Sequence, residues 1–258
     1  MINDYFLEVA GLTVSFPKVD GRRGEMTTVL NHLNLTIPEK QFLCVLGPSG
    51  CGKTTLLNCI AGFQKYEGDI LFKGRPVVAP APERGVMFQD YGLFPWFSVQ
   101  QNVEFGPKMK KMSAPERKSI ADKYIELVGL ADFRNQYPNY LSGGMKQRVS
   151  LARVLANEPE FLLMDEPFAA LDEQTRQKMQ SELLDVWEQN RITCMFITHS
   201  ITEALYLADR ILVLMPNPGR VALDVKIELP RLRDRNDPQL LAYQERISNI
   251  LFRQKNGE

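Results

Sequence analysis

The sequence predicts an α/β fold in which a parallel sheet is joined by an antiparallel β subdomain and a helical subdomain. Short unbroken apolar runs, such as residues 42–46 and 161–164, are typical of strands buried on both faces of a parallel sheet. Each of these runs is followed by a turn and a helical pattern, which is the order of an α/β domain. Residues 7–37 instead alternate apolar and polar side chains, as antiparallel strands do.

The charge balance and the hydrophobic content of the chain argue against nucleic-acid-binding and disordered proteins. The chain has 258 residues, with 31 Lys and Arg against 31 Asp and Glu and a formal net charge of +0. A balanced charge provides no basic field for a phosphate backbone, so we expect no nucleic-acid partner. The hydrophobic content of 44% is too high for a disordered chain.

The cysteines and the lengths of the apolar runs indicate where in the cell the protein is located. The four cysteines lie singly, without a Cys-x-x-Cys pair, and are expected to be reduced thiols of a cytosolic protein. No apolar run approaches the roughly 20 residues that cross a bilayer, and the first ten residues lack the pattern of a signal peptide. We therefore expect a soluble chain, or one peripheral to a membrane.

The elements follow in order along the chain. Strand-like alternation covers residues 7–16 and 29–37, separated by a polar loop through Gly21 and Gly24. Buried strands are predicted at 42–46, 85–88, 161–164 and 193–197. A helical insert occupies 98–157, where Ser113 and Glu116 form a capping-box pattern and Gly129 ends the helix. A hairpin is predicted from 210–214 and 221–229, and an amphipathic helix from 239–252.

These elements predict three parts. Residues 1–97 and 158–229 would form the main α/β core with the antiparallel β subdomain, residues 98–157 a helical subdomain, and residues 230–258 a C-terminal tail and helix.

A phosphate-binding motif follows the first buried strand. Residues 47–54 fit G-x-x-x-x-G-K-[ST], with a strand before them and a helix after them. Glycines let backbone N–H groups converge on phosphate oxygens, and the helix start adds about half a positive charge. Lys53 would reach the β- and γ-phosphates, and the Thr54 hydroxyl would ligate Mg²⁺. The predicted cofactor-binding residues here are Gly47, Pro48, Ser49, Gly50, Cys51, Gly52, Lys53, Thr54 and Thr55.

Cys51 lies inside this loop, close to a helix start, where a thiolate is stabilised. Alkylation of a reactive Cys51 would block turnover, and bound nucleotide would protect it. The alternative is an unreactive thiol.

Two carboxylates end another buried strand. Residues 161–164 lead directly into Asp165 and Glu166, at the edge of the sheet where α/β proteins bind ligands. Asp165 is predicted to hold the metal, and Glu166 to accept a proton from the attacking water. An acidic pair after a strand is by itself more often a helix cap, but the phosphate motif reverses that preference.

A second anion site is possible at Ser142, Gly143 and Gly144. A serine cap followed by two glycines exposes N–H donors at the start of a helix. On physical grounds alone, ordinary helix capping is the preferred interpretation.

Together these motifs resemble those of the ABC-type ATPases. Leu141 to Gly144 with the basic residues that follow, placed between a phosphate loop and an Asp-Glu strand, is similar to the signature of that family over nearly the whole chain. The resemblance implies a P-loop NTPase (RecA-like) core, ATP and Mg²⁺ as cofactors, and ATP hydrolysis. It also implies a head-to-tail homodimer, in which Ser142, Gly143 and Gly144 of one copy close over the ATP of the other.

Further roles follow from the resemblance one position at a time. Gln89 corresponds to a glutamine that touches Mg²⁺ and the attacking water, so the implied metal ligands are Thr54, Gln89 and Asp165. His199 corresponds to a histidine on the γ-phosphate, and Asp172 to a loop that crosses the dimer interface. The implied catalytic residues are Glu166, His199, Gln89 and Lys53.

Phe16 matches an aromatic residue that stacks on adenine, although a place in the core is an equal alternative. Met145 and Ser200 depart from the commonest family residues.

A subfamily is also indicated. Three short segments resemble those of the ATPase subunits of importers of nitrate, sulfonate, taurine and bicarbonate. They are Leu93-Phe-Pro-Trp96, Pro218-Gly-Arg220 and Leu229-Pro-Arg-Leu-Arg. That resemblance implies a homodimer beneath two transmembrane permease subunits, fed by an extracytoplasmic solute-binding protein, on the cytoplasmic face of the inner membrane. Trp96 would line the permease docking groove. An ABC exporter or lipid-trafficking ATPase is the alternative function. The sequence of the ATPase does not identify the transported solute.

Overall fold

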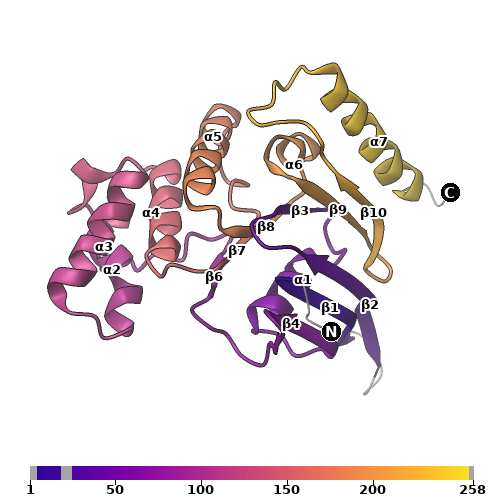
Figure 1. Cartoon of the computed structure of the whole chain (residues 1–258), viewed down its shortest axis with the longest axis horizontal. Coiled ribbons are helices and arrows are strands. Elements are labelled where there is room, and N and C mark those ends of the chain that lie inside the picture. The colour runs from indigo at the N-terminus through magenta and orange to yellow at the C-terminus, as the bar shows by residue number, and fades with distance from the viewer. Residues whose placement is uncertain (1–4, 19–24, 256–258) are drawn as a thin grey trace. The chain divides into compact units, whose positions relative to one another are not determined.

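The computed structural model describes residues 5–18 and 25–255. The chain forms two compact units, one of residues 1–80 and 193–258 and one of residues 81–192, and each is described by itself (Figure 1). The polar loop expected through Gly21 and Gly24 lies outside the described residues. The three-part division predicted from the sequence stays a prediction.

The first unit contains the predicted antiparallel sheet. Strands β1 (Leu7–Pro17), β2 (Met26–Ile37), β4 (Glu67–Phe72) and β5 (Arg75–Pro76) lie in the order β2-β1-β4-β5. Strand β1 pairs antiparallel with both β2 and β4. Its buried side chains are the alternating apolar ones: Leu7, Val9, Leu12 and Val14. The period of two gives one face of this sheet to the core, and an irregularity of the β1–β2 pairing between Val9 and Leu12, where Gly11 has a φ of 60°, keeps Leu12 and Val14 on that face.

Parallel strands make the rest of the first unit. Strand β3 (Phe42–Leu46) lies parallel to both β8 (Thr193–Thr198) and β9 (Arg210–Met215). Every residue of β3 and β8 is buried, as predicted for strands covered on both faces. Strand β10 (Arg220–Lys226) pairs antiparallel with β9, which confirms the hairpin. The helices are α1 (Lys53–Ala61), α6 (Ile201–Leu207) and α7 (Pro238–Lys255).

The second unit holds two parallel strands, β6 (Arg84–Met87) and β7 (Phe161–Asp165). All of β7 is buried, but in β6 only Met87 is, and the following Phe88 is 45% exposed. The prediction that residues 85–88 are covered on both faces is therefore wrong. Strand β6 ends its sheet, so it has a neighbour on one side only.

Helices dominate the second unit. They are α2 (Val99–Met109), α3 (Ala114–Leu127), α4 (Gly143–Leu155) and α5 (Glu173–Asn190), with short 3₁₀ turns at Ala131–Phe133 and Pro138–Tyr140. Helices α2, α3 and α4 pack together (Figure 1). The capping box of Ser113 and Glu116 is present, and Gly129 follows α3 with a φ of 67°.

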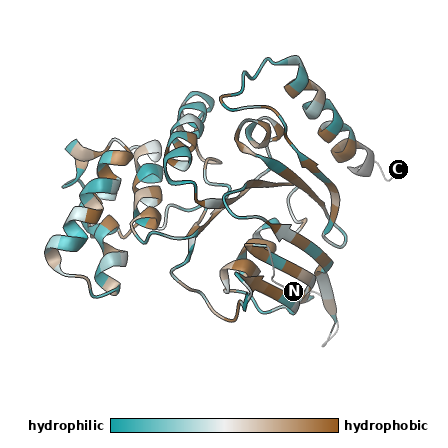
Figure 2. Cartoon of the chain, viewed as in Figure 1, coloured by the Kyte–Doolittle hydropathy of each residue, from teal (hydrophilic) through white to brown (hydrophobic). Residues whose placement is uncertain are grey.

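Side-chain polarity follows this architecture. Figure 2 shows brown, hydrophobic residues along the strands and teal, hydrophilic turns on helices such as α3. Among the described residues, none of the helices combines the length and the hydropathy that a membrane span requires.

Candidate nucleotide-binding site

The loop between β3 and α1 has the backbone shape of an anion cradle. Gly50 and Gly52 have φ angles of 79° and 95°, a left-handed region that side chains disfavour. Gly52 is the N-cap residue of helix α1 and provides no side-chain cap, and the first turn of the helix contains no acidic residue. The electropositive helix start is therefore not neutralised by a side chain of the helix itself.

Close packing fixes the loop from behind. A Cβ on Gly47 would collide with the carbonyl oxygen of Leu214 in β9, and one on Gly52 would lie 2.6 Å from Cδ2 of Leu30 in β2. A Cβ on Gly219, in the β9–β10 turn, would lie 2.5 Å from the carbonyl oxygen of Cys51. Two strands and a turn of the first unit thus hold the loop in one shape. Sequence reasoning identified the loop glycines but missed Gly219, because the turn lies far away along the chain.

Lys53 lies folded along the loop. Its Nζ donates to the carbonyl oxygens of Gly47 at 2.7 Å and Pro48 at 3.1 Å, and the residue is 6% exposed. The ammonium group is therefore already positioned beside the backbone that the motif assigns to phosphate.

Burial decides between the two interpretations of Cys51. The residue is 0% exposed, which favours the unreactive thiol over a thiolate open to alkylation. The other three cysteines, Cys44, Cys59 and Cys194, are also buried and free. Burial raises the pKa of the Cys59 thiol to about 12.

His199 lies exposed between β8 and α6, and the residues on both sides of it are fixed by hydrogen bonds. The Thr198 hydroxyl donates to the buried carboxylate of Glu203, and Thr198 Oγ1 accepts from the Ser200 amide at 3.0 Å. Ser200 caps α6, since its Oγ accepts from the Glu203 amide at 3.3 Å. The departure at Ser200 is therefore a helix cap. The spacing of Ser200 and Glu203 is a capping-box signal that could have revealed this network.

The two carboxylates lie where the sequence placed them, at the end of β7. Asp165 is the last residue of the strand and is 9% exposed. Glu166 has a φ of 43°, which is uncommon for a residue with a side chain and concentrates at functional sites. The next helix, α5, is capped by Asp172 instead, so the helix-cap alternative for Asp165 and Glu166 is wrong.

Asp172 and Gln89 are both exposed loop residues of the second unit. The Asp172 carboxylate accepts a hydrogen bond from the Thr175 amide at 3.0 Å, and this bond lowers the pKa of the Asp172 carboxyl. Gln89 lies two residues beyond the end of β6.

The start of α4 is a capped helix, as expected from physical grounds alone. Ser142 Oγ accepts from the Met145 amide at 3.3 Å. A Cβ on Gly143 would lie 3.1 Å from the Tyr91 hydroxyl oxygen, and one on Gly144 would lie 3.1 Å from Cγ2 of Thr175. The two glycines thus leave space for neighbouring side chains. Capping engages only one amide of the first turn, so it is compatible with an anion role.

Phe16 is 36% exposed near the end of β1, whereas Leu12 and Val14 on the same strand are buried. The alternative that places Phe16 in the core is therefore wrong. Stacking on adenine stays a prediction.

The candidate residues fall into two sets. The first unit carries Phe16, the loop of residues 47–55 and His199, and the second carries Gln89, Ser142, Gly143, Gly144, Asp165, Glu166 and Asp172. Within each unit these residues come mainly from strand ends and helix starts, where ligands of α/β proteins bind.

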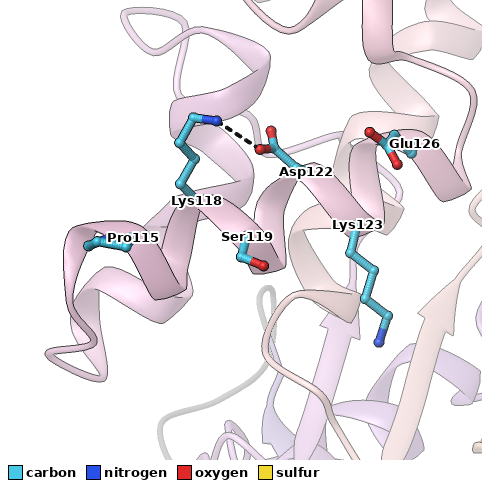
Figure 3. Close-up of a pocket in the computed structure, with 6 residues that line it drawn as sticks. All are labelled: Pro115, Lys118, Ser119, Asp122, Lys123 and Glu126. Atoms are coloured by element: carbon cyan, nitrogen blue, oxygen red, sulfur yellow. Dashed lines mark hydrogen bonds and ion pairs between the residues drawn. The ribbon is translucent and has the colours of Figure 1, made fainter.

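A shallow pocket elsewhere is not part of either set. It runs along α3 and is lined by Pro115, Lys118, Ser119, Asp122, Lys123 and Glu126 (Figure 3). All six residues belong to one helix, and Lys118 forms an ion pair with Asp122 at 3.0 Å. This polar helix surface offers no convergent groups for a ligand.

Known proteins match the chain over most of its length. An uncharacterised ABC transporter ATP-binding protein of Methanocaldococcus jannaschii is 50% identical over 95% of this chain and 91% of that protein. A nitrate import ATP-binding protein of Synechocystis sp. is 42% identical over 90% of both chains. An aliphatic sulfonates import ATP-binding protein of Bacillus licheniformis is 42% identical over 89% of both.

Solved structures of ATP-binding cassettes are also similar to this chain. A dimeric ATP-binding cassette in a post-hydrolysis state, bound to ADP and phosphate, superposes with a TM-score of 0.74 at 31% identity, over 87% of this chain and 100% of that one. The family described as ABC transporter matches residues 30–169. The chain therefore belongs to the ABC transporter family, as an ATP-binding cassette ATPase subunit with the P-loop NTPase fold that its sequence predicts.

Proposed function

We propose that the chain powers an importer of a small anion, such as nitrate, a sulfonate or bicarbonate. A homodimer would act beneath two permease subunits at the cytoplasmic face of the membrane, and an extracytoplasmic protein would deliver the solute. The observation that carries this proposal is the similarity to nitrate and sulfonate import subunits along nearly their whole length. Taurine is itself a sulfonate, so it belongs to the same chemical class.

ATP would bind to the loop of residues 47–55 in one copy. The left-handed glycines and the uncapped start of α1 suit the phosphates, and the Lys53 ammonium suits their charge. Glu166 would accept a proton from the attacking water, and His199 would contact the γ-phosphate. Phosphoryl transfer needs positioning more than covalent help, which fits a loop fixed by packing.

The residues present also suit Mg²⁺. Thr54, Gln89 and Asp165 all offer oxygen atoms, which Mg²⁺ prefers. No group of three or more His, Cys, Asp or Glu side chains that could hold a metal occurs in the described part of the chain. That finding fits an ion held by one carboxylate together with substrate phosphates and waters. Bound Mg²⁺ would neutralise charge on the β- and γ-phosphates.

The second copy would complete the site. Ser142, Gly143 and Gly144 at the start of α4 would close over the γ-phosphate bound to its partner, and Asp172 would cross the interface. ATP would then join the two copies, and hydrolysis would release them. The dimeric cassette structures among the solved relatives support this arrangement.

The permease would dock on residues 91–97, which we call the docking segment. It contains Trp96, which is 67% exposed and lies against Phe94 with ring centroids 5.9 Å apart. A large exposed aromatic side chain on a supporting cluster is typical of an interface anchor.

Solute uptake tests the proposal. A strain that lacks the gene should lose uptake of one of three isotope-labelled solutes, nitrate, the sulfonate taurine or bicarbonate, and a plasmid copy should restore it. A copy carrying Trp96→Ala should restore uptake poorly, whereas Phe133→Ala, which alters another exposed aromatic residue of the second unit, should restore it fully.

Two results would count against this function. Unchanged uptake of all three solutes in the deletion strain would remove the assignment to a small oxyanion or sulfonate. Accumulation of a solute inside the deletion strain, in place of loss of uptake, would favour the exporter alternative.

A further inference from the structure

One side chain ties the docking segment to helix α4. Arg153 donates from Nη1 to the Gly92 carbonyl oxygen at 2.6 Å and from Nη2 to the Tyr91 carbonyl oxygen at 3.2 Å. Its guanidinium carbon also lies 5.7 Å from the centre of the Phe94 ring. A planar guanidinium holds its donors in a rigid fork and can stack on a ring, whereas a lysine ammonium is a point charge on a flexible stem.

Arg153 has few other means to compensate its charge. The residue is partly buried, and burial lowers the pKa of its guanidinium. In the part of the chain that the structure describes, Arg153 forms no ion pair, and its hydrogen bonds go to carbonyl oxygens of the docking segment. Separating the segment from α4 would therefore break two hydrogen bonds of a charged group and a ring contact, with only water to replace them.

The same segment also touches the other end of α4. The Tyr91 hydroxyl oxygen lies so close to Gly143 that a Cβ there would be 3.1 Å away. Tyr91 thus contacts the first turn of α4 through its hydroxyl and the last turns through its carbonyl. The docking segment and the signature glycines are direct neighbours within one compact unit.

The docking segment is itself held in one shape. Asn102 of α2 is 0% exposed, its Oδ1 accepts from the Phe94 amide at 2.9 Å, and its Nδ2 donates to the Phe97 carbonyl oxygen at 3.0 Å. Phe94 packs on Phe105 with ring centroids 4.6 Å apart. These contacts restrict bending of the segment, so a displacement at Trp96 would be passed to its contacts on α4.

We propose that Arg153 is a positioning residue that makes the docking segment and helix α4 move as one body. A permease that shifts Trp96 would then shift Ser142, Gly143 and Gly144 against the ATP of the partner copy. This inference rests on the proposed function. Because coupling between two sites is reciprocal, ATP held by those residues must also shift the docking segment. The link can therefore be measured in the ATPase alone.

Trp96 supplies the signal for that measurement. It is 67% exposed, whereas Trp187 is 3% exposed, so iodide quenches the fluorescence of Trp96 selectively. In Glu166→Gln protein, saturating MgATP should change the iodide quenching constant. Adding Arg153→Met, which keeps the aliphatic stem but removes the donors, should abolish most of that change. Arg153→Lys should give an intermediate change.

A matched control and a folding check accompany these variants. Arg117→Met removes another guanidinium of the second unit, which bonds to Glu104 at 3.2 Å, and should leave the MgATP response complete. A full response in folded Arg153→Met protein would overturn the inference. If that variant does not fold, a full response in Arg153→Lys protein would overturn it equally.

Failure of the ATPase activity on which the proposed function depends would look different. Parent protein with Glu166 that hydrolyses no ATP would contradict the ATPase assignment itself. Parent protein that hydrolyses ATP, while Trp96 in its Glu166→Gln form shows no response to MgATP, would contradict the link alone.

Discussion

Helices α1 and α4 both begin at glycine-rich segments assigned to phosphate, yet their starts are built differently. The first turn of α1 follows Gly52, with a φ of 95° and no side-chain cap, and is packed from behind by Leu30. The first turn of α4 follows Ser142 in extended conformation, with its hydroxyl bonded to the Met145 amide.

The two segments differ in whether each forms a complete phosphate-binding site by itself. Packing within its own unit gives the α1 loop a cradle whose shape needs glycine. The α4 start is a satisfied, capped helix, which gains an anion role only when another surface brings a phosphate to it. Changes in the first segment should therefore damage nucleotide binding in each copy, and changes in the second should damage only the joint action of two copies.

The largest expected effect comes from Lys53→Ala. The variant removes the ammonium that donates to the Gly47 and Pro48 carbonyls and that would neutralise the phosphates. Phosphate release should fall to background. Lys118→Ala, on the outer surface of α3, is the matched control and should keep the parent rate. Measurable turnover by the Lys53 variant would refute the assignment of the loop.

Glu166→Gln should have the next largest effect. Glutamine keeps the size of the side chain but cannot accept the proton, so turnover should fall by about 10²- to 10⁴-fold while ATP still binds. Nucleotide affinity and single-turnover hydrolysis measure the two properties separately. Turnover equal to that of the parent protein would remove Glu166 from its proposed role.

A pair of glycine variants sharpens the comparison directly. Gly52→Ala forces a side chain into a left-handed backbone, against Leu30 at 2.6 Å, at a cost of about 1–3 kcal/mol. Gly144→Ala meets only the Thr175 methyl group at 3.1 Å, and it has no positive φ. We expect Gly52→Ala to weaken ATP binding, and Gly144→Ala to bind ATP normally but hydrolyse it slowly. Equal binding losses in a nucleotide titration would erase the distinction between the two segments.

A smaller effect is expected from Thr198→Val, which removes the hydroxyl that links Glu203 to the Ser200 amide beside His199. Loss of hydrogen bonds to a buried carboxylate should lower turnover by about 10-fold through His199. Thr198→Ser keeps the hydroxyl and should be close to the parent. In the His199→Ala background the valine should cost nothing further, and an additive loss would show a purely structural role.

The smallest effect concerns the thiols. Burial raises the pKa of Cys59 to about 12 from a usual value of 9.0, so the folded protein holds this thiol protonated. Its contribution to stability is complete below pH 9 and is lost as the pH rises from 9 through 12, because the unfolded thiol ionises first. At pH 8 the folded protein should resist iodoacetamide at all four cysteines, and urea should expose them. Rapid labelling of Cys51 in the folded state would restore the reactive-thiol alternative.

Local patterns in the sequence were enough to locate the strands and the phosphate motif. The unbroken runs of β3, β7 and β8, the period of two in β1 and the glycines of residues 47–52 each act through near neighbours. Exposure of Phe88 and Phe16 was not predictable, because it depends on what the fold packs over the ends of their strands. The contacts of Gly219 with the phosphate loop and of Arg153 with Gly92 were also missed. Both join residues more than 60 positions apart in the sequence, and no spacing rule reaches that far.

The central claim is that the start of α4 in one copy acts on ATP held by the other, and a mixing experiment tests it most directly. Lys53→Ala disables the loop of one copy. Ser142→Asp keeps a good helix cap but places a negative charge where the γ-phosphate would bind. Ser113→Asp, at the similarly capped start of α3, is the control and should be fully active.

Each of the two disabled proteins should be inactive alone. In an equimolar mixture, a heterodimer unites the intact loop of the Ser142 variant with the intact α4 of the Lys53 variant, so ATP hydrolysis should reappear. A mixture that stays as inactive as its components, although the two proteins associate, would contradict the claim.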